Sequence, residues 1–122
     1  MRCYKCGSVL SETEYCNSCG ADVKIYKKII RMSNSMYNAG LEKAKNKELS
    51  GAADMLRRSI MMDKNNIQAR NLLGLVYYEM GEFVDALSQW VISKNIKPDK
   101  NLADDYIKDV QYNPVKLESM NM

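Results

Sequence analysis

The sequence contains no histidine. This absence removes the commonest general base, the usual partner of a serine or cysteine nucleophile, and every metal site that uses an imidazole ligand. The glycine-rich patterns GxGxxG and GxxxxGK, which cradle phosphate groups, do not occur either. Asp, Glu, Lys and Tyr are present, but the sequence does not cluster them. We therefore expect a protein that is not an enzyme.

Long apolar runs are also missing. No stretch approaches the roughly 20 residues that span a bilayer, and the N-terminus has no signal-peptide core. The formal net charge of +3 is too small to require nucleic acid as a partner. These features predict a cytoplasmic chain made of one domain and a small additional module.

Four cysteines stand at the N-terminus as two CxxC pairs, each followed by glycine: Cys3, Cys6, Cys16 and Cys19. A CxxC turn points two thiolates at one ion, and four thiolates suit tetrahedral zinc. A disulfide framework and a redox site are less favoured alternatives. A cytosolic chain keeps its thiols reduced, and a redox CxxC usually lies on a βαβ unit. A closed four-thiolate shell leaves no position for a substrate, so the predicted metal is structural.

Residues 1–22, which we call the clip, resemble the short zinc-ribbon modules at the N-termini of many bacterial proteins. The shared pattern is CxxCGxxLxxxxxCxxCG, with Leu10 at its apolar position. The resemblance implies a structural Zn²⁺ held by all four cysteines.

Basic residues follow the clip at helical spacing, namely Lys24, Lys27, Lys28 and Arg31. Steps of three and four residues place them on one helix face. A solvated face is the favoured interpretation. Binding of nucleic acid or another anionic partner is the alternative.

Apolar periodicity predicts helices over residues 23–47, 49–62 and 102–111, and two more within residues 67–98. Gly81 and Glu82 mark the break between that last pair. The pattern assigns an apolar stripe to each helix, and we interpret most of the nine methionines as pliant core residues. The predicted inward residues include Ile25, Met32, Met61, Met80 and Val91.

Residues 67–98 resemble the tetratricopeptide repeat, a helix–turn–helix unit of about 34 residues. The positions that define the family's sequence pattern correspond here to Leu73, Gly74, Tyr77, Ala86, Trp90, Ser93 and Pro98. When the pattern is moved back by one repeat unit, Gly74 corresponds to Gly40, and the other positions that match it include Ala52, Leu56 and Ser59. We call this shift of one unit the repeat step. Lys47 stands where the turn glycine of the earlier unit is usual.

This resemblance implies an all-α fold in which antiparallel helix pairs build a right-handed superhelix. The helical domain would cover residues 23–122. It would contain a long first helix with a divergent repeat (23–66), a full repeat (67–100) and capping helices (101–122). Asn113 and Pro114 predict the start of a last helix over 115–122. The whole arrangement resembles longer clostridial repeat proteins of unassigned role, and we expect self-association or a longer parent chain.

In the resembled family the first helices of the repeats line a concave groove for a partner peptide or helix. The positions carried over are Asn34, Tyr37, Leu41, Ala44 and Lys45 in the first repeat, and Gln68, Asn71, Leu75, Tyr78 and Glu79 in the second. The resemblance implies a protein–protein interaction scaffold. An adaptor that binds nucleic acid through the clip and the neighbouring basic face is the alternative.

Overall fold

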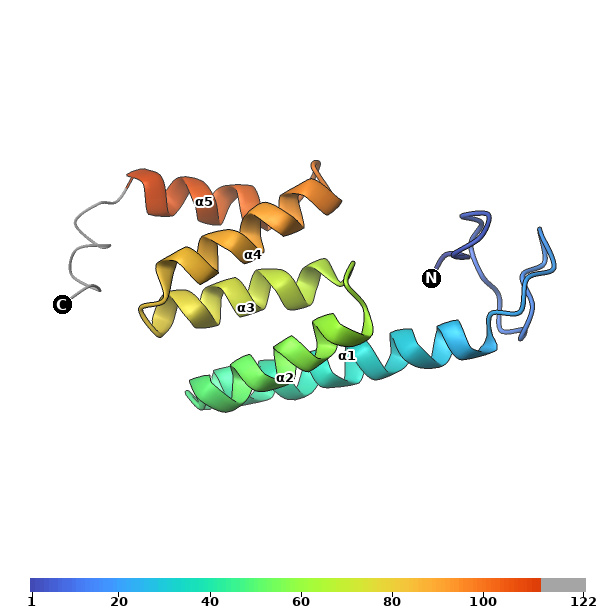
Figure 1. The fold of residues 1–122 in the computed structure, drawn as a ribbon, viewed down its shortest axis with the longest axis horizontal. Coiled ribbons are helices and arrows are strands. Elements are labelled where there is room, and N and C mark those ends of the chain that lie inside the picture. The colour runs from blue at the N-terminus through green and yellow to red at the C-terminus, as the bar shows by residue number, and fades with distance from the viewer. Residues whose placement is uncertain (113–122) are drawn as a thin grey trace.

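A computed structural model describes residues 1–112 of the chain. Five helices follow the clip and stack in chain order, each packing on the one before (Figure 1). Within the described residues the clip has two isolated β-bridges and no longer strand. The predicted all-helical fold is therefore confirmed for this part of the chain. The helices are α1 (Lys24–Lys45), α2 (Leu49–Met62), α3 (Ile67–Glu79), α4 (Phe83–Ile96) and α5 (Leu102–Tyr112).

Three of the four boundaries of the first two helices are related to those of the next two by the repeat step, while α1 begins earlier than the step would place it. The shift that carries Gly40 onto Gly74 also carries both ends of α2 onto both ends of α4. The same shift carries the end of α1, Lys45, onto the end of α3, Glu79. The periodicity of the sequence is therefore present in the helix boundaries as well as in the residue types.

The turns that join each pair are also alike. Lys47 has a φ of 63°, and Gly81, one repeat step later, has a φ of 83°. In both turns the next residue donates its N–H to the carbonyl five positions upstream, at 2.9 Å. A glycine adopts this left-handed conformation freely, whereas the same conformation costs a lysine roughly 1–2 kcal/mol. Lys47 therefore adopts the turn conformation that its side chain disfavours.

Replacing Lys47 by glycine should stabilise the protein by about 0.5–1 kcal/mol, because the left-handed strain disappears while the unfolded chain gains some freedom. The ion pair lost with Glu79 is long, at 3.9 Å, and exposed, so it offsets little of the gain. Denaturant unfolding would measure the change. The reciprocal variant Gly81→Lys should lose about 1 kcal/mol. A Lys47→Gly protein less stable than the wild type would contradict this account of the turn.

The two helices of each pair cross at a glycine. A Cβ added at Gly74 would lie 2.1 Å from Nε1 of Trp90, and one added at Gly40 would lie 2.8 Å from Cγ of Leu56. Trp90 and Leu56 occupy equivalent positions in the two pairs, and both side chains are fully buried. The two helices of each pair are thus in close contact at a glycine, and the contact at Gly74 is the tighter.

Buried polar groups hold the pairs together. Ser33 on α1 and Ser59 on α2 exchange hydrogen bonds, each hydroxyl donating to the other's carbonyl at 2.7–2.8 Å. Asn66 donates to the Ser33 hydroxyl at 3.0 Å and caps α3 by accepting from Ala69 N–H. Asn101 repeats the arrangement, donating to the Ser93 hydroxyl at 2.9 Å. Each asparagine therefore ties the end of one pair to the start of the next helix.

Several predicted core residues are instead exposed. Ile25 is 71% exposed because α1 extends past α2 at that end, and Met61 is 81% exposed. The buried side of α2 contains Ala52, Leu56 and Ser59, and Met61 lies about 200° around the helix from Ser59. The apolar stripe predicted for this helix left out Ser59 because serine is polar, although the repeat pattern includes it. Met32, Met80 and Val91 are also exposed, so the interpretation of most methionines as core is wrong for the described residues.

The helix predicted over residues 115–122, with its start at Asn113 and Pro114, lies outside the described residues. Among the helices that the structure does describe, none combines the length and apolar character needed to cross a membrane.

Candidate functional site

The clip consists of two matching turns, related by the shift that carries Cys3 onto Cys16. In each turn this first cysteine donates its N–H to the carbonyl five residues ahead at 2.8 Å. The glycine after the second cysteine, Gly7 or Gly20, donates back to the first cysteine's carbonyl at 3.0 and 2.8 Å. Both glycines have positive φ, 78° and 75°. The backbone therefore holds both CxxC pairs in the same conformation.

The two turns bring the four sulfur atoms together. The Sγ atoms of Cys3 and Cys19 lie 3.7 Å apart, those of Cys6 and Cys16 lie 3.5 Å apart, and all four lie within 4.8 Å of one another. Sulfurs at ~2.3 Å from one zinc ion would lie ~3.8 Å apart. The thiols are free, and their separations far exceed a disulfide bond of ~2.05 Å. The cluster can therefore hold one metal ion.

The electrostatics of the cluster favour a cation. Hydrogen bonds from Ser8 lower the pKa of Cys6 to about 6, and the Cys6 backbone N–H lowers the pKa of Cys3. For Cys19 a backbone hydrogen bond from Ala21 also lowers the pKa, but desolvation and the neighbouring thiols outweigh it and raise the value to about 11. Four thiolates this close repel one another unless a positive ion lies between them.

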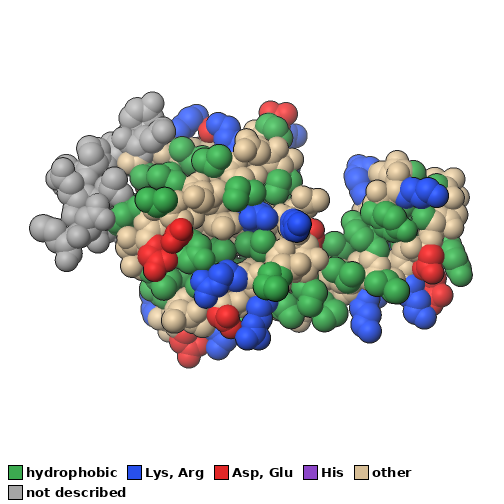
Figure 2. Space-filling model, in the orientation of Figure 1, with side chains coloured by type: hydrophobic (Ala, Val, Ile, Leu, Met, Phe, Trp, Pro, Cys, Tyr) green, Lys and Arg blue, Asp and Glu red, His purple; other side chains and the backbone are tan. Residues whose placement is uncertain are grey.

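Helix α1 begins directly against the clip. Lys27 is buried, and its Nζ donates to the carbonyls of Ser11 and of Thr13, the latter at 2.7 Å. The rings of Tyr4 and Tyr26 lie 5.4 Å apart. These contacts fix the loop between the two CxxC turns to the first turns of α1. Figure 2 shows the clip as a lobe beside the main helical body.

The predicted basic face is divided by these contacts. Lys27 hydrogen-bonds to backbone carbonyls of the clip, and Lys24 Nζ lies 3.8 Å from a carboxylate oxygen of Glu14. Lys28 and Arg31 are exposed. The four residues line one hollow together with Glu12, Thr13 and Glu14, so this side of α1 meets the clip. Helical spacing alone could not indicate that contact.

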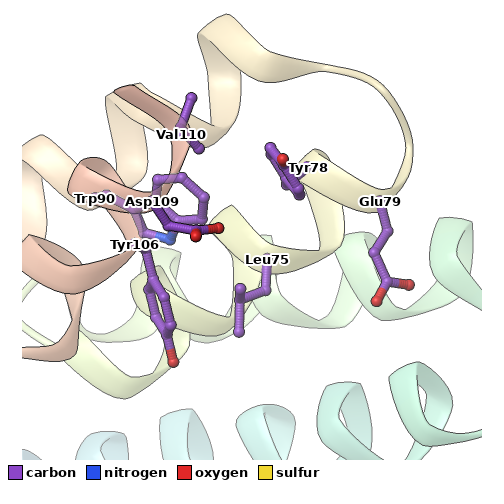
Figure 3. A pocket seen from close by; sticks show the side chains of 7 residues that line it. All are labelled: Leu75, Tyr78, Glu79, Trp90, Tyr106, Asp109 and Val110. Atoms are coloured by element: carbon purple, nitrogen blue, oxygen red, sulfur yellow. The ribbon is translucent and has the colours of Figure 1, made fainter. Parts of the chain in front are cut away.

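A cavity of about 310 Å³ lies between α3 and α5, with Trp90 of α4 beside it. In Figure 3 the labelled side chains of α5 and of Leu75 and Tyr78 surround one space, and Glu79 lies at its edge. Its walls are largely aromatic and aliphatic, and two carboxylates, Glu79 and Asp109, add negative charge. The lining residues are Leu75, Tyr78, Glu79, Trp90, Tyr106, Asp109 and Val110.

A smaller hollow of about 110 Å³ lies beside it and shares Leu75 and Glu79 with it. Its lining residues are Ala44, Leu49, Leu72, Leu75, Val76 and Glu79. Four of the ten predicted groove residues, Ala44, Leu75, Tyr78 and Glu79, therefore line one or both of these neighbouring spaces.

The other six predicted groove residues lie outside both spaces: Asn34, Tyr37, Leu41, Lys45, Gln68 and Asn71. Asn71 donates to Asn101 at 2.9 Å, and Asn34 accepts from Asn66 at 3.3 Å, so these two amides join helices. The sequence also missed the contribution of α5, from which Tyr106, Asp109 and Val110 line the larger cavity. The apolar stripe of that helix was the available signal.

The fold and the site define an all-helical protein with a four-cysteine cluster that can hold a metal ion at its N-terminus. Comparison of the chain with protein-family models, with curated proteins and with solved structures gives no match.

Proposed function

We propose that the clip binds one structural zinc ion through Cys3, Cys6, Cys16 and Cys19. The sulfur separations near the edge of a zinc–thiolate tetrahedron support zinc, as does the resemblance to zinc ribbons. Four thiolates complete the coordination shell, so the metal's contribution would be to fold the clip.

We further propose that the helical part is of the tetratricopeptide type and belongs to its right-handed superhelix. Support comes from the boundaries of α2 and α4, the paired turns at Lys47 and Gly81, and the glycine crossings, all related by the repeat step.

The function that this arrangement supports best is a non-catalytic scaffold that binds a segment of a partner protein between α3 and α5. The observation that supports this function is the 310 Å³ cavity, whose lining includes three of the predicted groove residues, the apolar Leu75 and Tyr78 and the acidic Glu79. Glu79 and Asp109 add carboxylates to that lining. The proposed ligand is therefore an extended or helical segment with a large apolar side chain next to a lysine or arginine.

Selection of peptides from a display library on the zinc-loaded protein tests this proposal. The selected peptides should carry that combination of apolar and basic residues. Glu79→Lys should weaken their binding about tenfold, because it places a positive charge beside the peptide's own. Glu42→Lys is the matched control, since Glu42 is exposed on α1 outside both hollows. Equal affinities of wild type and Glu79→Lys, measured by fluorescence anisotropy, would refute the site.

Nucleic-acid binding through the clip and α1 is the weaker candidate, because Lys27 is used internally and Lys24 lies near Glu14. A steep fall of affinity with added salt would favour this alternative over the groove.

A further inference from the structure

Lys27 of α1 is a buried lysine whose side-chain hydrogen bonds all go to the clip. It is only 7% exposed, and its Nζ donates to the carbonyls of Ser11 and Thr13. Glu12 and Glu14 line the same hollow, but none of the ion pairs among the described residues includes Lys27. A buried ammonium group is costly unless it is hydrogen-bonded and its charge is compensated. The two carbonyls satisfy the first condition only.

The two carbonyls belong to the loop that joins the two CxxC turns. The backbone hydrogen bonds of the clip stay within residues 1–10 or within residues 14–23, so they do not hold the two turns together. Apart from the sulfur cluster, the side-chain hydrogen bonds that connect one turn to the joining loop or to the far end of the clip are exposed. Lys27 therefore supplies the buried polar contact that fixes this loop.

We infer that Lys27 is a positioning residue of the metal site, although it is not a ligand. By holding the Ser11 and Thr13 carbonyls against α1, it keeps the two CxxC turns at the separation that one ion requires. This inference rests on the proposed zinc site. Outer residues that orient metal ligands typically change metal affinity by about 10–100-fold when they are replaced.

The charge of the loaded site supports the same role. Four thiolates around one Zn²⁺ leave a net negative charge on the cluster. A loaded clip therefore supplies the compensation that the buried ammonium group of Lys27 lacks among the carboxylates. The metal and the start of α1 should then stabilise each other, and by equal amounts, because such coupling is reciprocal.

Zinc affinities of full-length variants, measured by competition with a chromophoric chelator, test the inference. Lys27→Met keeps the aliphatic chain but removes the donors, so it should weaken zinc binding about 10–100-fold. Lys28→Met, at the next and exposed position, is the matched control and should bind like the wild type. Lys27→Arg should recover most of the affinity, because a guanidinium group can donate to both carbonyls.

Two further measurements separate positioning from general packing. The visible spectrum of the cobalt-loaded Lys27→Met protein should match that of the wild type, because all four thiolates still bind. Thermal unfolding of Lys27→Met should differ from the wild type with metal and agree with it in excess chelator.

Three results would overturn the role of Lys27 while the four-cysteine site stands. They are equal zinc affinities of Lys27→Met and wild type, an altered cobalt spectrum, and a loss of stability that is the same with and without metal. A wild-type chain that binds neither zinc nor cobalt would refute the proposed metal site and this inference with it.

Discussion

Replacing Cys16 by serine is expected to release the metal and unfold the clip. Cys16 is buried, and its Sγ lies 3.5 Å from that of Cys6, so it forms one corner of the sulfur cluster. The clip shares only a small apolar cluster with Val23 and Tyr26, which is too little for it to fold without a metal. Zinc binding at such sites supplies roughly 10–16 kcal/mol. Elemental analysis should therefore find one zinc per wild-type chain and well under one in the variant.

The amide spectrum should show where the structure is lost. In the variant the signals of residues 1–22 should collapse to unfolded positions. The start of α1 should also loosen, since Lys27 loses the Ser11 and Thr13 carbonyls that hold it. Ser18→Ala, an exposed change between Cys16 and Cys19, should keep the metal. A Cys16→Ser protein with a full complement of zinc and a folded clip would contradict the site.

Replacing Gly74 by alanine should cause the largest loss of stability in the helical part. The new methyl group would lie 2.1 Å from Nε1 and 2.6 Å from Cδ1 of Trp90. The indole has little room to move, because it donates to the Asn71 carbonyl at 3.2 Å and lies against the rings of Tyr78 and Tyr106. Helices α3 and α4 must therefore separate. We expect a net loss of about 3 kcal/mol, or roughly 10–20 °C in Tm, after subtracting the helix propensity that alanine gains.

Two further glycine variants are matched controls for this result. Gly40→Ala meets Leu56, a side chain that can rotate, at 2.8 Å, so it should cost about 1 kcal/mol. Gly51→Ala meets only the flexible chain of Lys43, at 3.2 Å, and should be neutral or stabilising by up to about 1 kcal/mol. Equal effects at Gly74 and Gly51 in thermal unfolding would show that the indole does not limit the crossing.

The helices could be predicted from the sequence because small and large residues recur at the repeat step. Gly40 and Gly74 marked the crossings, and the predicted ends of the second helix match the observed α2. Exposure was harder to predict, because periodicity shows that residues share a face without showing what covers it. Ile25 is exposed because α1 extends past its partner. Ser33, Ser59 and Ser93 are buried because their hydroxyls are hydrogen-bonded, which an apolar pattern cannot register.

The four-cysteine cluster was predictable because its members are close in sequence and two CxxC pairs have few chemical roles. The residues that line the cavity were predicted only in part. Positions carried over from a family identified Leu75, Tyr78 and Glu79, which do line the cavity. Asn34 and Asn71 instead join helices, because they hydrogen-bond to Asn66 and Asn101. Helix α5 contributes to the cavity because it packs beside α3. Groove positions carried over onto α3 give no information on where α5 packs.

The central functional claim is that a partner segment binds between α3 and α5. An NMR titration of the isotope-labelled, zinc-loaded protein with a selected peptide tests it most directly. The claim predicts that the largest amide shifts occur at the cavity residues, Leu75, Tyr106 and Val110 among them, while the clip and the exposed side of α4 around Val84 change little. The claim would be contradicted if the largest shifts occurred in the clip, at Lys28 and Arg31 of α1, or around Val84.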